Sequence, residues 1–345
     1  MRYLITGGAG FIGSHLVDTL IGRGDEVLVL DDLSTGRREN IEHVEHSRHL
    51  EFIEGSTTDA DLVDQCMSSV DFCFHLASAV GVQLIVTRPL DSLLKNVLGT
   101  QVVMAKAAEH NRPLLYTSTS EIYGKNSTGA LDEDCDRLLG SPFKSRWSYA
   151  TAKAFGEALA HSYYREVGAS MIVVRLFNTV GPRQTGRYGM VLPTLVEQAL
   201  KGQDVTVYGN GTQTRCFIHV LDTVLALTLL GDDGDAYGKV FNIGDDVEVA
   251  IIELARRIIE RTQSTSKVML VPYGDAYDDG FEELGRRKPD NSRLRAHTGW
   301  APARTVDDAI DDTITYFRSR ALDPHAESAN GRDALTPVSA PRPLG

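Results

Sequence analysis

Short apolar runs alternate with longer amphipathic stretches along most of the chain. The runs have the length of buried strands and read YLIT, EVLVL, LEFIEG, VDFCFHLAS, PLLYTSTS, SMIVVRLFN and KVFNIG. The stretch after the first run repeats apolar residues with helical spacing at Phe11, Ile12, Leu16 and Leu20. Strands that alternate with helices predict a doubly wound parallel α/β sheet.

A glycine-rich turn joins the first strand to the first helix. Gly8, Gly10 and Gly13 have the G-x-G-x-x-G spacing, and Gly7 is also available to the turn. Glycines let the backbone approach a pyrophosphate, and the N-terminus of the helix attracts its charge. The turn therefore predicts a dinucleotide-binding site.

An acidic residue, Asp31, ends the second strand, where it can accept hydrogen bonds from an adenosine ribose. Its charge would repel a 2′-phosphate, so the sequence favours NAD over NADP. Arg37 and Arg38 follow closely and keep NADP as the alternative.

Two polar clusters follow that suit chemistry at the carboxyl ends of the strands. Thr119, Ser120 and Glu121 lie where the run PLLYTSTS leaves the sheet. Tyr149 and Lys153 are four residues apart, on one face of a helix. A nearby lysine and a positively charged nicotinamide favour the phenolate, so Tyr149 is a candidate general base.

Composition narrows the class of partner. The 345 residues are 42% hydrophobic and carry a net charge of −12, spread along the chain, which argues against nucleic acid or an anionic membrane. The four cysteines are not paired in spacing, and His43, His46 and His49 lack the pattern of a metal site, so we expect no metal. With neither a signal peptide nor a membrane-spanning run, the sequence predicts a soluble, cytoplasmic protein.

Together, TGGAGFIG, Asp31, HLAS, TSTSEIYG, YATAK and RLFNTVGPR resemble the extended short-chain dehydrogenase/reductase family that acts on nucleotide sugars. The resemblance extends from residue 1 to about 318. It implies a Rossmann domain for NAD, a smaller C-terminal domain for a UDP-sugar, and a homodimer that packs two helices of each subunit. We expect the first domain over 1–179, rejoined by a segment near 214–246, the second over 180–320, and a disordered tail over 321–345.

The resemblance also assigns roles to residues. Thr119 and Tyr149 are expected to contact the sugar 4-hydroxyl, with Lys153 tuning Tyr149. The residues expected to bind the cofactor are Gly7, Gly10, Phe11, Ile12, Gly13, Asp31, Asp32, Ala77, Asn96, Thr117, Tyr149 and Lys153. Those expected to bind the substrate are Asn178, Arg187, Arg215 and Arg287.

Glu121 and Arg287 favour one reaction within this family. The serine and glutamate of TSTSE, and the late segment RKPD, resemble the UDP-glucuronate decarboxylases. Oxidation at C4 of a glucuronate makes a β-keto acid, which loses CO₂ readily. Arg287 would orient the carboxylate, Glu121 or Ser120 would manage the proton at C5, and the product would be UDP-xylose or the 4-keto pentose.

The sequence is also compatible with other functions. Arg187 could instead hold the carboxylate in the sugar plane and suppress CO₂ loss, as a UDP-glucuronate 4-epimerase that makes UDP-galacturonate would require. A UDP-glucose 4-epimerase and a nucleotide-sugar 4,6-dehydratase are further alternatives. Outside the enzymes, an NAD(H)-binding regulator could share the fold, although such proteins are expected to lose Tyr149 or Lys153.

Overall fold

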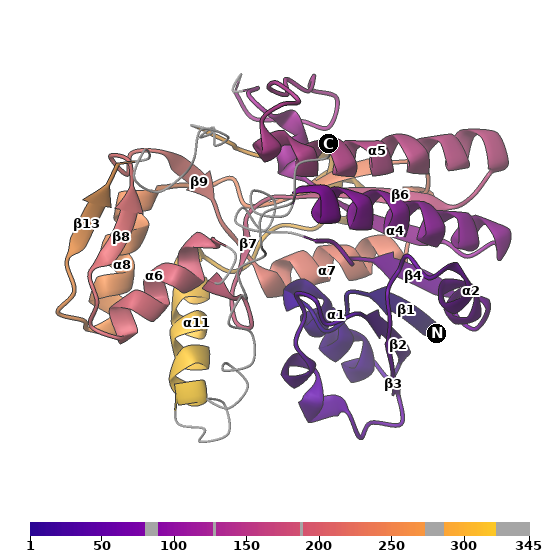
Figure 1. Ribbon diagram of the computed structural model, residues 1–345, viewed down its shortest axis with the longest axis horizontal. Helices are drawn as coiled ribbons and strands as arrows, with labels where there is room; N and C mark the ends of the chain where they lie inside the picture. The colour runs from indigo at the N-terminus through magenta and orange to yellow at the C-terminus, as the bar shows by residue number, and fades with distance from the viewer. Residues whose placement is uncertain (80–88, 127–128, 187–188, 273–285, 322–345) are drawn as a thin grey trace, which may run out of the picture.

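The largest element of the computed structural model is a parallel sheet of seven strands (Figure 1). The structure describes residues 1–79, 89–126, 129–186, 189–272 and 286–321. Across the sheet the strands are β11 (Val240–Ile243), β6 (Met171–Leu176), β5 (Leu114–Thr119), β4 (Phe72–His75), β1 (Arg2–Thr6), β2 (Glu26–Asp31) and β3 (Leu50–Glu54). Every neighbouring pair is parallel, which confirms the predicted doubly wound α/β class.

Helices cover both faces of this sheet. One apolar core lies under α1 (Phe11–Gly22) and α7 (Val220–Gly231) and includes Tyr3, Phe74 and Leu115. The core of the opposite face lies under α2 (Ala60–Ser68), α4 (Pro89–Glu109) and α5 (Ser148–Ser162) and includes Leu4 and Tyr116. Successive side chains of β5 thus enter different cores, as the pleat of a strand requires.

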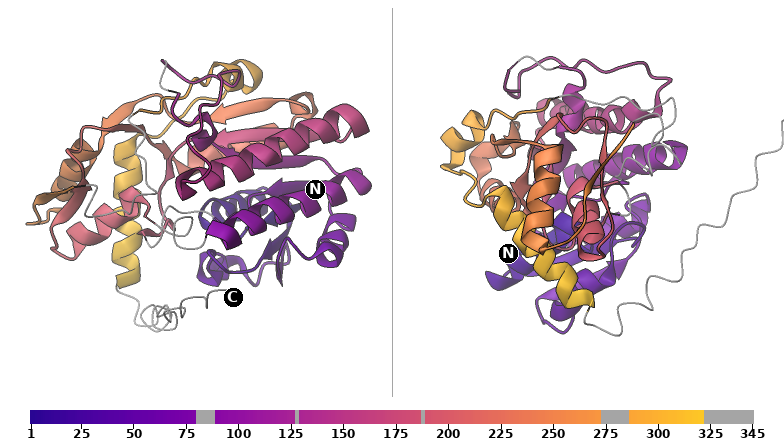
Figure 2. Two further views of the ribbon diagram at one scale, coloured as in Figure 1. Left: turned by 45° about the horizontal axis from the view of Figure 1, so that its top comes forward. Right: turned by 90° about the vertical axis from the view of Figure 1, so that its left-hand side faces the viewer.

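A second, smaller group of elements lies to one side of the sheet (Figures 1 and 2). Its core is formed mainly by α6, α8 and α11, with contributions from short strands. The group consists of β7 (Thr179–Val180), α6 (Val191–Leu200), β8 (Val205–Tyr208), β9 (Thr214–Cys216), β10 (Ile218–His219), β12 (Glu248–Ala250), α8 (Ile251–Thr262), β13 (Val268–Val271) and α11 (Val306–Ala321).

The chain passes between the two groups several times. It returns to the large sheet with α7 and β11, and again with α10 (Ser292–Thr298), which contacts β11. Short helical turns complete the connections: η1 (Arg38–Asn40), η2 (Glu42–Val44), η3 (Ser120–Tyr123), η4 (Ser145–Trp147), η5 (Tyr163–Val167) and η7 (Gly234–Ala236). The residue boundaries expected for the two domains stay a prediction, and residues 322–345 of the expected tail lie outside the described residues.

Candidate functional site

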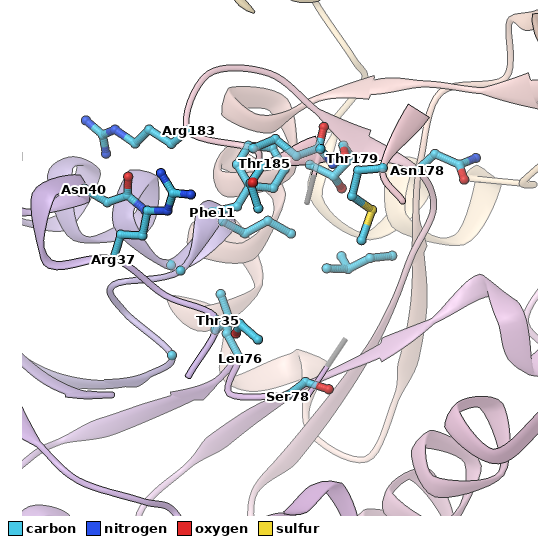
Figure 3. A pocket seen from close by; sticks show the side chains of 18 of the residues that line it. Phe11, Thr35, Arg37, Asn40, Leu76, Ser78, Asn178, Thr179, Arg183 and Thr185 are labelled. Atoms are coloured by element: carbon cyan, nitrogen blue, oxygen red, sulfur yellow. Dashed lines mark hydrogen bonds between the residues drawn. The ribbon is translucent and has the colours of Figure 1, made fainter. Parts of the chain in front are cut away.

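A cavity of about 1280 Å³ opens at the carboxyl ends of the strands, where the two groups of elements meet (Figure 3). Parallel sheets bind ligands at this edge because the helix N-termini and the loops after the strands converge there. Most of the predicted site residues line the cavity: Gly7, Gly10, Phe11, Ile12, Gly13, Asp31, Asp32, Ala77, Asn96, Thr117, Thr119, Ser120, Glu121, Tyr149, Lys153, Asn178 and Arg287.

The glycine-rich turn has no room for side chains. Gly7 has a left-handed backbone (φ 76°), and a Cβ there would lie 2.8 Å from the Ala77 nitrogen. A Cβ at Gly13 would lie 2.1 Å from the Gly7 carbonyl oxygen. The first N–H groups of α1 have no side-chain cap at Gly10, so they can bind an anion such as a diphosphate.

Asp31, the last residue of β2, and Asp32 hold the next loop in place. The Asp31 carboxylate accepts hydrogen bonds from the Ala9 and Leu33 nitrogens, both at 2.9 Å. Burial raises the pKa of this carboxyl, and these two hydrogen bonds oppose the rise. Asp32 accepts from Ser34 and, at 3.1 Å, from the Lys95 ammonium. Both aspartates line the cavity, so each can face the hydroxyls of a ribose.

Arg37 and Arg38, whose charges left NADP as the alternative cofactor, have different surroundings. Arg38 forms an ion pair with Glu45, and its guanidinium lies 4.5 Å from the centre of the Phe52 ring. Arg37 lines the cavity.

The Asn96 side chain forms hydrogen bonds with Ser78 and Ala79, which line the cavity. Its side-chain oxygen accepts from the Ala79 nitrogen at 2.8 Å and from the Ser78 hydroxyl at 2.9 Å, and its amide donates to the Ala79 carbonyl at 3.0 Å. The buried Thr117 hydroxyl similarly donates to the His75 carbonyl at 3.0 Å. The Asn96 contacts fix the segment after β4 against α4, and the Thr117 contact fixes the end of β5 against β4.

Tyr149 and Lys153 lie in the first turns of α5, buried against the end of β5. The Lys153 ammonium donates to the Thr117 carbonyl at 2.8 Å and lies 6.0 Å from the centre of the Tyr149 ring. Burial lowers the pKa of Lys153 to about 7. Burial and then the charge of Glu121 raise the pKa of Tyr149, whereas a hydrogen bond with Ser78 lowers it. The Tyr149 phenol therefore needs additional positive charge nearby to act as a base at neutral pH.

Glu121 is held by an arginine that the sequence did not single out. The Arg146 guanidinium donates to both carboxylate oxygens of Glu121, at 2.5 and 3.0 Å, and the Arg146 side chain is only 8% exposed. Burial alone would raise the pKa of Glu121, but the charges of Arg146 and Arg287 outweigh it and hold that pKa below its usual value. Glu121 is thus an ionised carboxylate.

Arg287 reaches the same point from the segment that precedes α10. Its Nη1 lies 3.8 Å from a Glu121 oxygen and donates to the Ser120 hydroxyl at 3.4 Å. The charge of Arg215, whose Nη1 donates to the Thr214 carbonyl, also lowers the pKa of Glu121. The Thr119 hydroxyl accepts from the Glu121 nitrogen at 3.2 Å. The end of β5 therefore carries one carboxylate between two guanidinium groups, which leaves a net positive charge for an anionic ligand.

The segment that carries Arg287 is fastened to the loop at Leu131 by backbone hydrogen bonds and to the sheet by the side chain of Asn242. The Leu131 nitrogen donates to the Lys288 carbonyl at 2.8 Å, and the Asp290 nitrogen donates to the Leu131 carbonyl at 2.9 Å. Asn242, in β11, donates to the Leu131 and Asp290 carbonyls and accepts from the Tyr123 hydroxyl at 2.7 Å. The position of Arg287 is therefore tied to the turn that contains Ser120 and Glu121.

Asn178 and Arg187 are the remaining predicted substrate residues. Asn178 lines the cavity while its amide donates to the Cys216 carbonyl at 2.9 Å. Arg187 lies outside the described residues.

Sequence reasoning missed Arg146 because its partner is 25 residues away along the chain. Its place three residues before Tyr149 was visible, but nothing in the sequence indicates that the turn η4 faces Glu121.

Comparison with known proteins gives a consistent result. The family model described as "NAD dependent epimerase/dehydratase family" matches residues 3–244. A UDP-N-acetyl-alpha-D-glucosaminuronate decarboxylase of Bacillus cytotoxicus is 38% identical over 92% of this chain and 98% of its own length. UDP-glucuronic acid decarboxylase 1 of Arabidopsis thaliana is 35% identical over 93% of this chain and 71% of its own length. Among solved structures, UDP-glucose 4-epimerase of Thermotoga maritima with UDP-glucose has a TM-score of 0.83 at 30% identity and covers 93% of this chain and 100% of its own.

Proposed function

The chain belongs to the NAD dependent epimerase/dehydratase family, and on that premise we propose that it is an NAD-dependent decarboxylase of a UDP-hexuronate. The observation that carries the proposal is the Arg146–Glu121–Arg287 cluster at the end of β5, beside Tyr149. Oxidation at C4 alone has no need of this cluster, whereas a sugar with a carboxylate at C6 presents the charge that its arginines attract.

When bound, NAD, the cofactor of the family, would supply hydride transfer from and back to the sugar C4. The glycine turn fits its diphosphate, since the first turn of α1 has open N–H groups and no Cβ intrudes, and Asp31 and Asp32 fit a ribose. The role of the protein is to hold the sugar C4 near the nicotinamide and to move the proton of the 4-hydroxyl.

Tyr149 takes that proton in our proposal. Because burial and Glu121 raise its pKa, the phenolate forms only when positive charge is added, and an oxidised nicotinamide and a protonated Lys153 both supply such charge. Thr119, at the end of β5, would bind the same sugar oxygen. Both assignments rest on the resemblance and on the common cavity of these residues.

The C4 ketone then makes the C6 carboxylate a β-keto acid. The C5–C6 bond breaks, CO₂ leaves, and the electron pair passes through C5 to the C4 oxygen as an enolate. Arg287 would face the carboxylate and then the enolate. Because Glu121 is ionised, it can orient a water molecule or accept a proton, whereas the proton added at C5 must come from water or from a hydroxyl such as that of Ser120.

Two substrates remain candidates for this site. The decarboxylases similar to this chain act, by name, on UDP-glucuronate or on its 2-acetamido counterpart. UDP-glucuronate is our first candidate, with UDP-xylose or the 4-keto pentose as product. The structural likeness to a UDP-glucose 4-epimerase makes 4-epimerisation the second candidate function, which on UDP-glucuronate would give UDP-galacturonate.

We also propose a homodimer. Leu90, Leu94 and Leu98 form a stripe on α4 with 66%, 46% and 45% of their surface exposed, and Phe155 on the adjacent α5 is 40% exposed. Apolar stripes of this kind commonly mark an interface between subunits.

Among the helices of the described residues, none is long and apolar enough to cross a membrane. The cytoplasmic location of the protein stays a prediction.

The test is product analysis with both uronates. Purified protein is incubated with UDP-glucuronate or UDP-N-acetylglucosaminuronate, and the masses of the products are measured by mass spectrometry. Loss of the mass of CO₂ from either substrate supports decarboxylation and identifies the substrate. A product of unchanged mass from UDP-glucuronate would instead support the epimerase. Tyr149→Phe is the control, since it should abolish turnover and still bind NAD.

A further inference from the structure

The loop 181–186, which follows β7, crosses from the second group of elements to the cofactor helix α1. The His15 Nε2, one turn into α1, donates to the Pro182 carbonyl at 3.0 Å. One turn further, the Asp18 carboxylate pairs with the Arg183 guanidinium at 2.7 Å and with His43 at the same distance. The loop is therefore tied to the same face of α1 at two successive turns.

These ties hold the loop in a conformation that its sequence does not prefer. Arg183 has a φ of 67°, in the left-handed region that side chains other than glycine rarely adopt. Burial lowers the pKa of His15 to about 4, so this side chain is a neutral ring that donates one hydrogen bond at neutral pH. Because local strain persists only where surrounding contacts hold it, the two ties to α1 explain why Arg183 keeps this backbone.

The same loop forms one wall of the cofactor cavity. Gly10, Phe11 and Ile12 of the phosphate-binding turn line one side, and Arg183 with the rest of the loop as far as Gly186 lines another. Figure 3 shows the Arg183 side chain extending toward the side of the cavity where Arg37 and Asn40 lie. Within the described part of the chain, the Arg183 Nη1 is buried without a hydrogen-bond partner, so the guanidinium is fixed in this position by Nη2 alone, through its ion pair with Asp18.

We propose that the loop 181–186 retains NAD in the cavity. The ion pair between Arg183 and Asp18 and the hydrogen bond between His15 and Pro182 tie the loop to α1, so that it closes the cavity over the diphosphate and slows release of the cofactor. Because the first residues of α1 and the loop line the same cavity, a molecule seated on the N-terminus of α1 would be enclosed in part by the loop, and opening of the ties would widen its way out. Arg183 is thus a positioning residue for the cofactor. This inference holds for an epimerase as well as for a decarboxylase.

The experiment measures NAD exchange without any sugar substrate. Protein loaded with deuterium-labelled NAD is mixed with an excess of unlabelled NAD, and the label that stays bound is followed by mass spectrometry. Arg183→Met and Asp18→Asn should each speed the loss of label about two- to fivefold, the range expected for a partly exposed ion pair. The double variant should exchange no faster than the faster single variant, because both changes break one contact.

Two further variants keep the test specific. His15→Phe keeps a ring beside Phe11 but removes the donor to Pro182, and its effect should multiply that of Arg183→Met. Arg261→Met removes ion pairs of similar exposure with Asp307 and Asp311, which join α8 to α11 and make no contact with the loop 181–186, and should leave exchange unchanged. Exchange at the wild-type rate in both Arg183→Met and Asp18→Asn, or effects of the two that multiply, would overturn the proposal.

Discussion

Lys153 shows how burial of a single side chain sets a pH dependence. Its pKa falls from the usual 10.5 to about 7 on folding. Between these values the unfolded lysine holds a proton and the folded one does not, so the free energy of unfolding rises with pH in this window. We predict that the cofactor-free protein gains stability relative to Lys153→Met as the pH is raised from 7 toward 10.

Denaturant unfolding of both proteins at several pH values tests this, and the difference between them isolates the lysine. A difference that stays constant from pH 7 to 10 would mean that Lys153 keeps its proton in the folded state, with a pKa near its usual value.

The Glu121–Arg146 pair predicts a strong dependence of each residue on the other. Removal of one partner leaves a buried charge without compensation, so Glu121→Gln and Arg146→Met should each cost about 3 kcal/mol of stability. The double variant Glu121→Gln/Arg146→Met should lose much less than the sum. Chemical denaturation measures all three.

A matched control is Arg286→Met, which removes a two-pronged but more exposed pair with Glu248. It should cost less stability than either change at the buried Glu121–Arg146 pair, because solvent screens an exposed ion pair. If the losses at Glu121 and Arg146 simply add, the two side chains do not act as a pair.

At the scale of elements, the turn between β1 and α1 is the part that tolerates least change. Gly13→Ala forces its Cβ against the Gly7 carbonyl and should lower stability by about 3 kcal/mol and abolish NAD binding. Gly22→Ala, at the other end of the same helix, meets nothing within 4 Å and should raise stability by up to about 1 kcal/mol. Thermal unfolding and NAD titration of both variants check the contrast.

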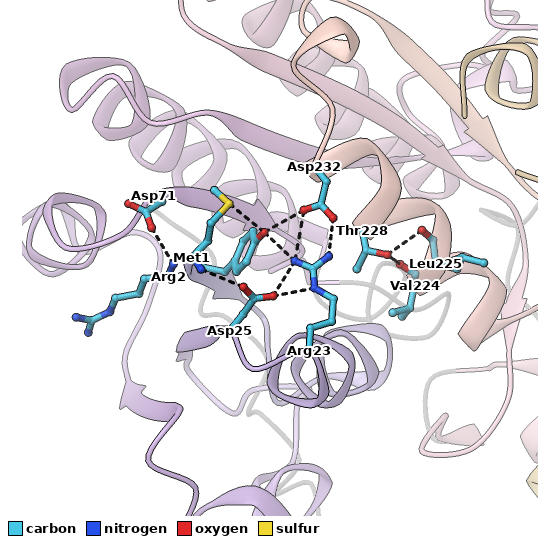
Figure 4. A network of polar contacts seen from close by, with 10 residues as sticks. Met1, Arg2, Arg23, Asp25, Asp71, Val224, Leu225, Thr228 and Asp232 are labelled. Atoms are coloured by element: carbon cyan, nitrogen blue, oxygen red, sulfur yellow. Dashed lines mark hydrogen bonds and ion pairs between the residues drawn. The ribbon is translucent and has the colours of Figure 1, made fainter. Parts of the chain in front are cut away.

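The far end of α1 is fixed by a separate network, so the two ends can be compared (Figure 4). Arg23 pairs with Asp25 at 2.7 Å and with Asp232 after α7 at 2.5 Å, and Asp25 accepts from the N-terminal ammonium. Since Gly22 precedes this network without crowding it, equal loss of stability in both glycine variants would contradict the account of the turn.

Sequence pattern predicts elements better than it predicts the contacts between them. The alternation of strands and helices, and the glycine turn before Asp31, were readable because the physical causes are local. The pairing of Arg146 with Glu121 and of Arg183 with Asp18 was not, because Arg146 and Arg183 lie in a short turn and a loop whose paths depend on tertiary packing. The position of Arg287 likewise depends on a distant part of the sequence, because Asn242 in β11 donates a hydrogen bond to the Asp290 carbonyl.

At the scale of the whole molecule, the exposed leucines of α4 predict the assembly. Leu94→Lys/Leu98→Lys should turn a dimer into monomers, because two charges would enter an apolar interface. Sedimentation velocity of both proteins measures the change. Leu270→Lys, at a 51% exposed position of β13, should leave the mass unchanged. A wild-type protein that sediments as a monomer at every concentration would rule out the proposed dimer.

The two groups of elements meet at one cavity, and the central claim is that the C4 ketone formed there directs the C5–C6 bond to break. Reaction with UDP-glucuronate in D₂O, followed by proton NMR, tests this most directly. We predict release of CO₂ and a UDP-pentose that carries deuterium at C5, since the proton added there comes from solvent. UDP-galacturonate that keeps its carboxylate and its original C5 hydrogen would contradict the account, and would make the protein a 4-epimerase.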